Sequence, residues 1–250
     1  QRGAPALADA AEIGVVVGDA PLQRHLERVG PQHHQVERHA HRQVRAQRAV
    51  HADERELQRI NPDAVLLYKF RRVQMRFKEP NKARIEGSQE GTKATFVTDG
   101  PEQWVQVPKL GIKTYRKYDD APGKRKTLMD VGLVSEYFLS YADAKFLREG
   151  VVDGTPVGVF ELTYKPHLKD TSKMVVYIDP KTRVIRKRDA YSQEGKLQAI
   201  YHFKEPREVA PGIWFPTRLE AQNLRGVIAG VTAYSDIRVN TGLPDSLFRL

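Results

Sequence analysis

The stretch VQMRFKEPNKARIEGSQEGTKATFVTDGPEQWVQV, residues 73–107, indicates the fold class. Val73, Met75 and Phe77 alternate with polar residues, which puts the apolar side chains on one face of an extended strand. The Asp-Gly pair at positions 99 and 100 separates two further runs of β-branched and aromatic residues, as in a hairpin turn. Because such short connectors join antiparallel neighbours, this stretch predicts an antiparallel meander.

The same period of two continues toward the end of the chain. It predicts about a dozen strands, at residues 65–79, 82–90, 93–98, 102–107, 112–118, 144–151, 155–165, 173–179, 183–191, 196–203, 213–222 and 226–239. The apolar faces of these strands would form one continuous dry face, which a long sheet covers by rolling up, by pairing or with a helix. We therefore expect a mainly β protein with a rolled, partly open barrel, whose interior is either a packed core or a cavity.

A helical pattern interrupts the strands at residues 127–141. Four apolar residues lie three or four positions apart, on one face of a helix: Leu128, Val131, Val134 and Phe138. The preceding residues 118–126 (YDDAPGKRK) are rich in turn-forming and charged types, which predicts a mobile loop. We expect a single helix that covers one mouth of the curved sheet.

Residues 1–67 differ in composition from the rest of the chain. They contain no Lys, Ser, Thr, Phe, Tyr, Trp or Met, and their nine Arg are balanced by nine acidic residues, so the whole net charge of +10 lies in residues 68–250. This segment is either a natural low-complexity arm or the product of a wrong reading frame or start, which its Arg-, Ala- and His-rich inventory matches better. We divide the chain into this biased segment, disordered or helical with a helix expected at 43–60, and a folded domain at 68–250.

Several classes of function are disfavoured by composition. The 250 residues include no Cys, so disulfide frameworks, thiolate zinc sites and a lipidated N-terminal cysteine are excluded. No run approaches the roughly 18 consecutive apolar residues that a membrane-spanning helix needs, and residues 1–20 do not have the pattern of a signal peptide. Histidines at positions 33, 34, 39 and 41 are close in sequence, but nothing around them predicts a rigid scaffold, so we expect no metal and no cofactor.

Five motifs in the folded domain resemble, in their order and spacing, the LolA-like periplasmic carriers of outer-membrane lipoproteins and the related lipoprotein-sorting proteins. They are RFKEPNKARI (76–85), VTDGPEQWVQVP (97–108), VYIDPKTRVI (176–185), IWFPTRLE (213–220) and LPDSLF (243–248). The resemblance covers roughly residues 66–250. It implies a half-open antiparallel β-barrel of about 11–12 strands with a helical lid.

The resemblance also implies a function. A protein of this family is a non-catalytic periplasmic carrier, which binds lipoprotein acyl chains or other lipid in the apolar concave face of its barrel for outer-membrane lipoprotein sorting. Its partners would be an inner-membrane release complex or an outer-membrane acceptor, and we expect a monomer. Carriers of the family have an Arg before the Pro that ends an early strand, and this Arg holds the lid. Here Glu79 takes that position, after Lys78, so no residue is assigned to the latch.

Large apolar side chains on the dry face are the candidates for a lipid-binding cavity, with ordinary core packing as the alternative role for each. These candidates are Met75, Phe77, Phe96, Trp104, Tyr115, Phe160, Tyr164, Met174, Tyr201 and Phe215. Helix residues Val131, Val134 and Phe138 would form the lid. Removing the lid residues should weaken ligand retention more than it lowers stability.

Three alternative functions are an enzyme, a nucleic-acid-binding protein and a sensor of the same fold. An enzyme is disfavoured because His167 and His202, the only histidines after residue 67, belong to no nucleophile or metal motif. Nucleic acid is not expected as a partner, because solvated hairpin faces explain the Lys and Arg clusters at 109–126 and 183–188 equally well. The strongest competitor keeps the fold and changes the role, to a periplasmic sensor that binds an anti-sigma factor, since fold alone does not select a function.

Overall fold

The computed structural model describes residues 41–60, 65, 68–70 and 73–250 of the chain. Within these residues, thirteen strands form one sheet, and every pairing in it is antiparallel. The strands are β1 (His41–Ala52), β2 (Val73–Lys78), β3 (Lys82–Gln89), β4 (Thr92–Asp99), β5 (Glu102–Val107), β6 (Ile112–Lys117), β7 (Ala142–Val152), β8 (Thr155–Tyr164), β9 (Lys173–Ile178), β10 (Ile185–Tyr191), β11 (Leu197–Ala210), β12 (Ile213–Gln222) and β13 (Ile228–Val239). The helices are short: α2 (Glu54–Ile60), α4 (Glu136–Tyr141) and the 3-10 segments η1 (Pro108–Leu110), η2 (Pro122–Lys124), η3 (Leu128–Val131), η4 (Pro166–Leu168) and η5 (Asp245–Phe248).

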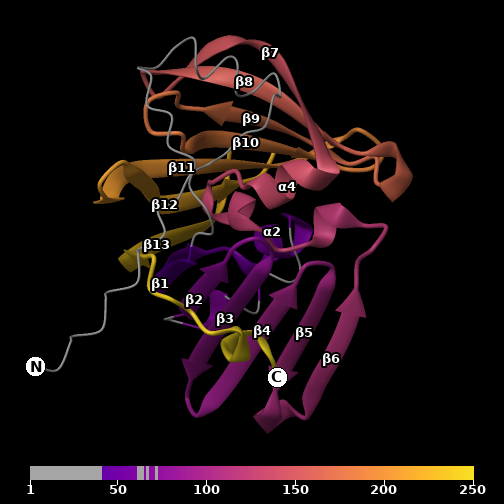
Figure 1. The fold of residues 1–250 in the computed structure, drawn as a ribbon, viewed down its shortest axis with the longest axis vertical. Coiled ribbons are helices and arrows are strands. Elements are labelled where there is room, and N and C mark those ends of the chain that lie inside the picture. The colour runs from indigo at the N-terminus through magenta and orange to yellow at the C-terminus, as the bar shows by residue number, and fades with distance from the viewer. Residues whose placement is uncertain (1–40, 61–64, 66–67, 71–72) are drawn as a thin grey trace, which may run out of the picture.

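The sheet is open. Its strand order is β6-β5-β4-β3-β2-β1-β13-β12-β11-β10-β9-β8-β7, so each pairing joins strands that are consecutive in sequence, except that β1 pairs with β13 and the consecutive strands β6 and β7 do not pair. Among the described strands, β6 and β7 each have one partner, and Figure 1 shows them at opposite ends of the molecule with α2 and α4 between the two halves of the curved sheet. The predicted half-open antiparallel barrel is confirmed.

Alternating apolar residues and turn residues position most of the strands within a few residues of their predicted ranges. The largest difference is at the first predicted strand, 65–79, because β2 begins only at Val73 and residues 68 and 69 are helical. Tyr68 and Phe70 from this preceding segment lie on the sheet, where Gly230 and Gly87 leave room for their rings. A Cβ at Gly230 would lie 2.7 Å from the Tyr68 ring, and one at Gly87 would lie 2.6 Å from the Phe70 ring.

Strand β1 lies in the segment for which sequence composition predicted no strand. A helix was expected at 43–60, but residues 41–52 are a strand that pairs with both β2 and β13, and only residues 54–60 are helical. The expectation of a helix is therefore wrong for 43–52 and confirmed for 54–60. The histidines at 33, 34 and 39, and residues 1–20, for which no signal-peptide pattern was found, lie outside the described residues.

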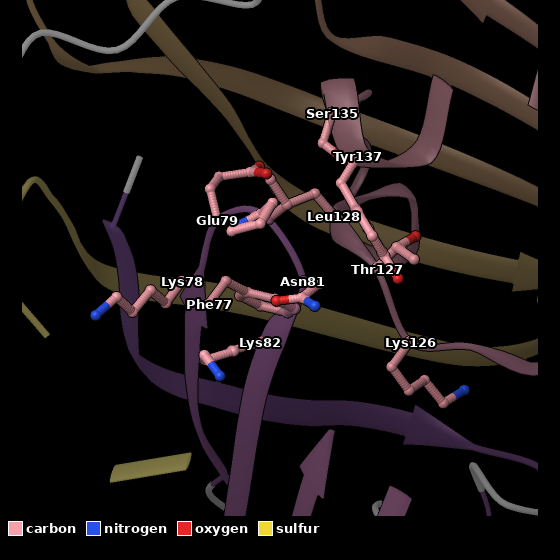
Figure 2. Close-up of a pocket in the computed structure, with 11 residues that line it drawn as sticks. Phe77, Lys78, Glu79, Asn81, Lys82, Lys126, Thr127, Leu128, Ser135 and Tyr137 are labelled. Atoms are coloured by element: carbon pink, nitrogen blue, oxygen red, sulfur yellow. The ribbon is translucent and has the colours of Figure 1, made fainter. Parts of the chain in front are cut away.

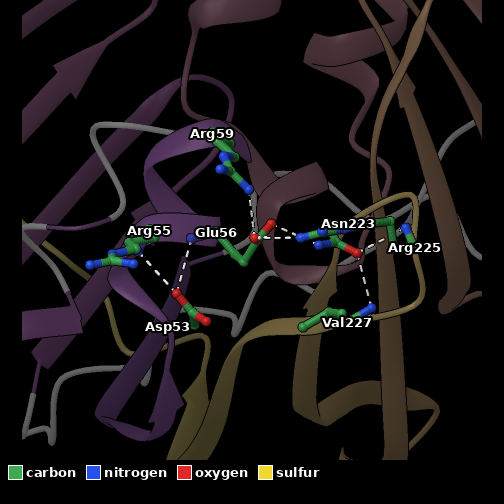
Figure 3. A network of polar contacts seen from close by, with 7 residues as sticks. All are labelled: Asp53, Arg55, Glu56, Arg59, Asn223, Arg225 and Val227. Carbon is green, nitrogen blue, oxygen red and sulfur yellow. Dashed lines mark hydrogen bonds and ion pairs between the residues drawn. The ribbon is translucent and has the colours of Figure 1, made fainter.

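Helix α2 is fixed to the sheet by apolar and polar contacts. Leu57 is 2% exposed, and its side chain packs against Gly230 on β13. The Glu56 carboxylate, also buried, accepts hydrogen bonds of 2.7 Å from Arg59 in the same helix and from Asn223 and Arg225 in the turn between β12 and β13 (Figure 3). These contacts join residues 54–60 to the far end of the chain, so α2 is an integral part of the fold.

The outer face of β3 to β5 is covered by the C-terminal segment. Leu243 and Phe248 pack against Val97 of β4, with Trp104 and Leu247 at the edge of this small cluster. Polar contacts add to this packing: the Lys78 ammonium donates to the Leu243 carbonyl and to Asp245, and the Arg84 guanidinium donates to the Leu247 carbonyl. The inner face of the sheet instead packs against residues 128–141.

Candidate functional site

The inner face of the sheet carries two hydrophobic clusters. The first cluster occupies the half formed by β2 to β4, β12 and β13, and it includes four of the predicted cavity residues. These are Met75, Phe77, Phe96 and Phe215. Phe70 and Tyr234 also belong to it, with the Phe215 and Tyr234 rings packed edge to face at 5.7 Å. Burial of side chains of this size stabilises the fold by about 1.5–3 kcal/mol each.

The second cluster occupies the half formed by β8 to β11, and it includes the other four predicted residues on this face. These are Phe160, Tyr164, Met174 and Tyr201. Phe160 and Phe203 are fully buried. Leu219 of β12 packs against both clusters, so the apolar interior runs from one half of the sheet to the other. Among the described residues, the side chains of both clusters pack against one another across this interior.

Two predicted cavity residues lie on the opposite face. Phe96 pairs with Val105 and Val97 pairs with Trp104, so Trp104 shares the face of Val97 and not that of Phe96. Tyr115 pairs with Trp104, lies 5.5 Å from its ring and is 53% exposed. The strand parity used for these two residues was therefore wrong, because parity within one strand does not say which face meets the core until the register is known.

The lid consists of residues 122–141, and it is not the single helix that the sequence predicted. Segment η3 and helix α4 are separated at Gly132, whose φ of +85° ends η3 in the left-handed conformation. Thr127 and Asp130 form a capping box at the start of η3, and Ser135 caps α4 by accepting from the Phe138 amide. Because the helix is interrupted at Gly132, η3 and α4 have separate orientations. Each piece can therefore pack its own apolar side chains against the sheet.

All three predicted lid residues are buried against the inner face. Val131 belongs to the first cluster, and Val134 and Phe138 belong to the second. Phe138 packs edge to face with Tyr141 at 5.3 Å and with Tyr164 at 6.1 Å. The lid thus joins the two clusters, and its effect on ligand retention stays a prediction.

A buried arginine connects the lid to the sheet, and sequence analysis missed it. Arg188 on β10 donates a 3.0 Å hydrogen bond to the Met129 carbonyl in η3 and lies 3.7 Å from the Asp130 carboxylate. Next to it, the Ile185 amide donates to the Gly132 carbonyl at 2.9 Å. The residue types alone carry no signal for this role, because an irregular register between 185 and 187 turns both Ile185 and Arg188 toward the interior.

Tyrosines surround the centre of the inner face and keep their protons. Burial raises the pKa of Tyr68, Tyr201 and Tyr234, and for Tyr201 the nearby Arg188 guanidinium acts in the opposite direction. The Tyr68 hydroxyl is hydrogen-bonded to the Thr232 hydroxyl at 2.8 Å. Phenols in this state donate hydrogen bonds and carry no charge, so the interior offers hydroxyl groups beside one buried cation.

A small pocket with a cavity volume of about 20 Å³ opens where the β2–β3 turn meets the lid (Figure 2). Its apolar wall is made by Phe77 and Leu128, and its rim is polar. Glu79, the position at which the resembling family has its latch arginine, lines this pocket together with Tyr137 of α4. The lid therefore lies near Glu79. The arginine that donates a hydrogen bond to the lid, Arg188, comes from the other half of the sheet.

The described residues contain no cluster of side chains that could hold a metal ion. No group of three or more His, Asp or Glu side chains converges within them. His202 lies on the face opposite Tyr201 and is 3.2 Å from the Gln222 side chain. Every helix in the described part of the chain is too short or too polar to span a bilayer.

Comparisons with known proteins agree with this architecture. A model of a protein family described as "Uncharacterized protein" matches residues 72–250. No curated protein is similar in sequence to the chain. Three solved structures resemble the fold at 16% sequence identity each.

The first of these structures is a domain from Vibrio parahaemolyticus described as an outer membrane lipoprotein-sorting protein, with a TM-score of 0.54 over 84% of this chain and 89% of that one. The second is a LolA superfamily protein from Nitrosomonas europaea, with a TM-score of 0.51 over 85% and 89%. The third is a DUF1329 family protein from Desulfovibrio piger, with a TM-score of 0.51 over 91% and 94%. Identities this low establish the fold alone.

Proposed function

The chain belongs to the family described as "Uncharacterized protein", whose model matches residues 72–250, and it has the LolA-like fold; on these premises we propose that it is a non-catalytic carrier of acyl chains. The lipid would bind on the inner face of the sheet, between the two hydrophobic clusters and under the lid. The observation that carries the proposal is the lid itself, which joins both clusters through buried apolar residues on two short helical pieces.

An acyl chain can replace the lid at little net cost. Each buried methylene contributes about 0.8 kcal/mol, so a chain of sixteen carbons gains on the order of 12 kcal/mol. Each large lid side chain that leaves the interior loses about 1.5–3 kcal/mol, and Leu128, Met129, Val131, Val134 and Phe138 are such side chains. Because the two quantities are similar, binding and release are both feasible without an external energy source.

The proposal extends to compartment and partners. We place the protein in the periplasm, with lipoprotein acyl chains or another lipid as cargo and with an inner-membrane release complex and an outer-membrane acceptor as partners. Fold-level similarity to the Vibrio domain and to the Nitrosomonas protein supports this assignment. A sensor of the same fold, which binds an anti-sigma factor, is the alternative role.

Native mass spectrometry with lipid extraction, on protein purified from its own host, tests the carrier function. We expect acyl lipid to be released when the purified protein is denatured. A Met174→Gln variant, which changes the inner face, should retain several times less lipid. A Tyr115→Ser variant on the outer face serves as the matched control and should retain as much as the unmodified chain. An empty protein, or equal retention by all three chains, would contradict the carrier and leave the sensor as the better hypothesis.

A further inference from the structure

Arg188 is a charged residue in an otherwise apolar interior. Its side chain is 9% exposed, and the guanidinium lies over the Tyr201 ring at 4.4 Å and near the Phe203 ring at 5.9 Å. Its register partners are Val176 on β9 and Tyr201 on β11, both on the inner face. Arginine side chains carry a positive charge in proteins, so the interior holds a cation.

The lid neutralises this charge in the closed structure. The hydrogen bond to the Met129 carbonyl and the ion pair with Asp130 both come from η3. The bonding is incomplete, since the Nε atom of Arg188 is buried and has no hydrogen-bond partner in the described structure. A buried cation that loses its acceptors is destabilising, and displacement of the lid by a ligand removes both of these acceptors together.

A ligand that displaces the lid must therefore satisfy Arg188. From this geometry we infer that the cargo is an anionic amphiphile, whose acidic head group takes the place of the Met129 carbonyl and the Asp130 carboxylate on Arg188 while its acyl chain replaces the apolar lid residues. A carboxylate or a phosphate fits the guanidinium, because both present two oxygens to its planar fork. The Tyr201 ring below the guanidinium holds the fork in place. This inference rests on the proposed carrier function and narrows its cargo.

The inference differs from a purely structural role for Arg188. If the arginine only fastened the lid, its removal would ease lid opening and would change the affinity for charged and neutral amphiphiles by the same factor. If it binds the head group, its removal weakens anionic ligands selectively. The ratio of two affinities for one variant therefore separates the two roles, whatever the variant does to the lid.

Binding of three probes, measured by isothermal titration calorimetry at neutral pH, provides this test. The probes are palmitate, dipalmitoyl phosphatidate and the neutral 1-hexadecanol, with Arg188→Met as the variant and Arg188→Lys as the conservative one. The matched control is Lys187→Met, which removes a charge from the opposite face of the same strand, where Lys187 pairs with Asp189. We expect at least one anionic probe to bind the unmodified protein tenfold or more tightly than hexadecanol.

That preference should disappear in Arg188→Met, return in part in Arg188→Lys and persist in Lys187→Met. The anionic probe that loses more affinity in Arg188→Met indicates whether the preferred head group is a carboxylate or a phosphate. Equal affinity of the unmodified protein for charged and neutral probes, or a loss in Arg188→Met that is the same for both, would overturn the inference and leave the carrier function standing. Failure of all three probes to bind would overturn both.

A measurement on the unmodified protein covers the case in which Arg188→Met does not fold. Palmitate labelled with ¹³C at the carboxyl carbon reports its own ionisation by NMR. In an ion pair with a buried guanidinium the carboxylate resists protonation, so its resonance should stay at the ionised position as the pH falls from 8 to 5. A resonance that titrates as it does for palmitate in neutral detergent micelles would contradict the contact with Arg188.

Discussion

Glu56 illustrates how a single buried carboxylate holds two distant segments together. It accepts bonds from Arg59, Asn223 and Arg225, and both arginines are more than two-thirds exposed. Because solvent screens exposed partners, the bonds are worth less than a fully buried pair. We expect Glu56→Gln to lower the free energy of unfolding by about 1–2 kcal/mol, which corresponds to a fall in Tm of about 2–8 °C.

Thermal unfolding followed by circular dichroism measures this effect. Glu54→Gln is the control, because Glu54 lies in the same helix. Its side chain is 63% exposed, and its ion pair with Lys69 is long, at 3.9 Å. Its Tm should change by less than about 2 °C. Equal shifts for the two variants would show that α2 is not fixed to the β12–β13 turn by Glu56.

Single residues were the hardest feature to predict from the sequence. Eight of the ten proposed cavity side chains do lie on the inner face, because alternation along one strand is a reliable guide once its core face is known. Trp104 and Tyr115 lie on the other face, since the C-terminal segment gives the outside of β4 and β5 an apolar cover of its own. Arg188 could not be found at all, because its inward orientation depends on an irregular register.

At the scale of elements, β1 tests whether the unusual N-terminal composition belongs to the natural fold. Val44 in β1 pairs with Ile237 on one side and with Met75 on the other. Proline at a central position removes a backbone donor and restricts the strand. We expect Val44→Pro to cost roughly 3 kcal/mol or more, a fall in Tm of about 6–12 °C.

Thr114→Pro is the matched control, because β6 is an edge strand and Thr114 pairs only with Val105 of β5. Scanning calorimetry should show a shift several times smaller for this variant. If Val44→Pro instead leaves Tm unchanged, β1 is not part of the folded sheet in solution. The interpretation of residues 1–67 as a wrong reading frame would then extend through this strand.

Elements differed in how well the sequence specified them. Strands such as β5 and β12 were predicted at their observed bounds because β-branched residues, aromatic residues and Gly turns agree there. β1 was missed because its sequence, HRQVRAQRAVHA, has neither alternation nor aromatics, and only pairing on both sides makes it a strand. The predicted helix at 127–141 divides in two because Gly132 adopts a positive φ and the Phe203 ring lies 2.6 Å from where its Cβ would be.

The whole molecule is built as two halves of one sheet closed by a lid. A packed interior and a carrier function are compatible only if the lid leaves when cargo enters. In the closed structure the Leu133 amide donates to the Leu128 carbonyl, the Leu139 amide to the Ser135 carbonyl and the Ile185 amide to the Gly132 carbonyl. These amides should therefore be protected from hydrogen exchange while the lid is closed.

Hydrogen exchange with and without palmitate tests this opening. Bound palmitate should speed exchange across residues 122–141, and at Ile185, by tenfold or more, because the chain occupies the space of the lid residues. Strands β8, β9 and β11 should keep their protection, since their backbone bonds do not involve the lid. Butyrate is the control ligand, because its chain buries too few methylenes to displace the lid. Palmitate binding with a fully protected lid would mean that the ligand sits elsewhere on the molecule, and the inner face would then be a core and nothing more.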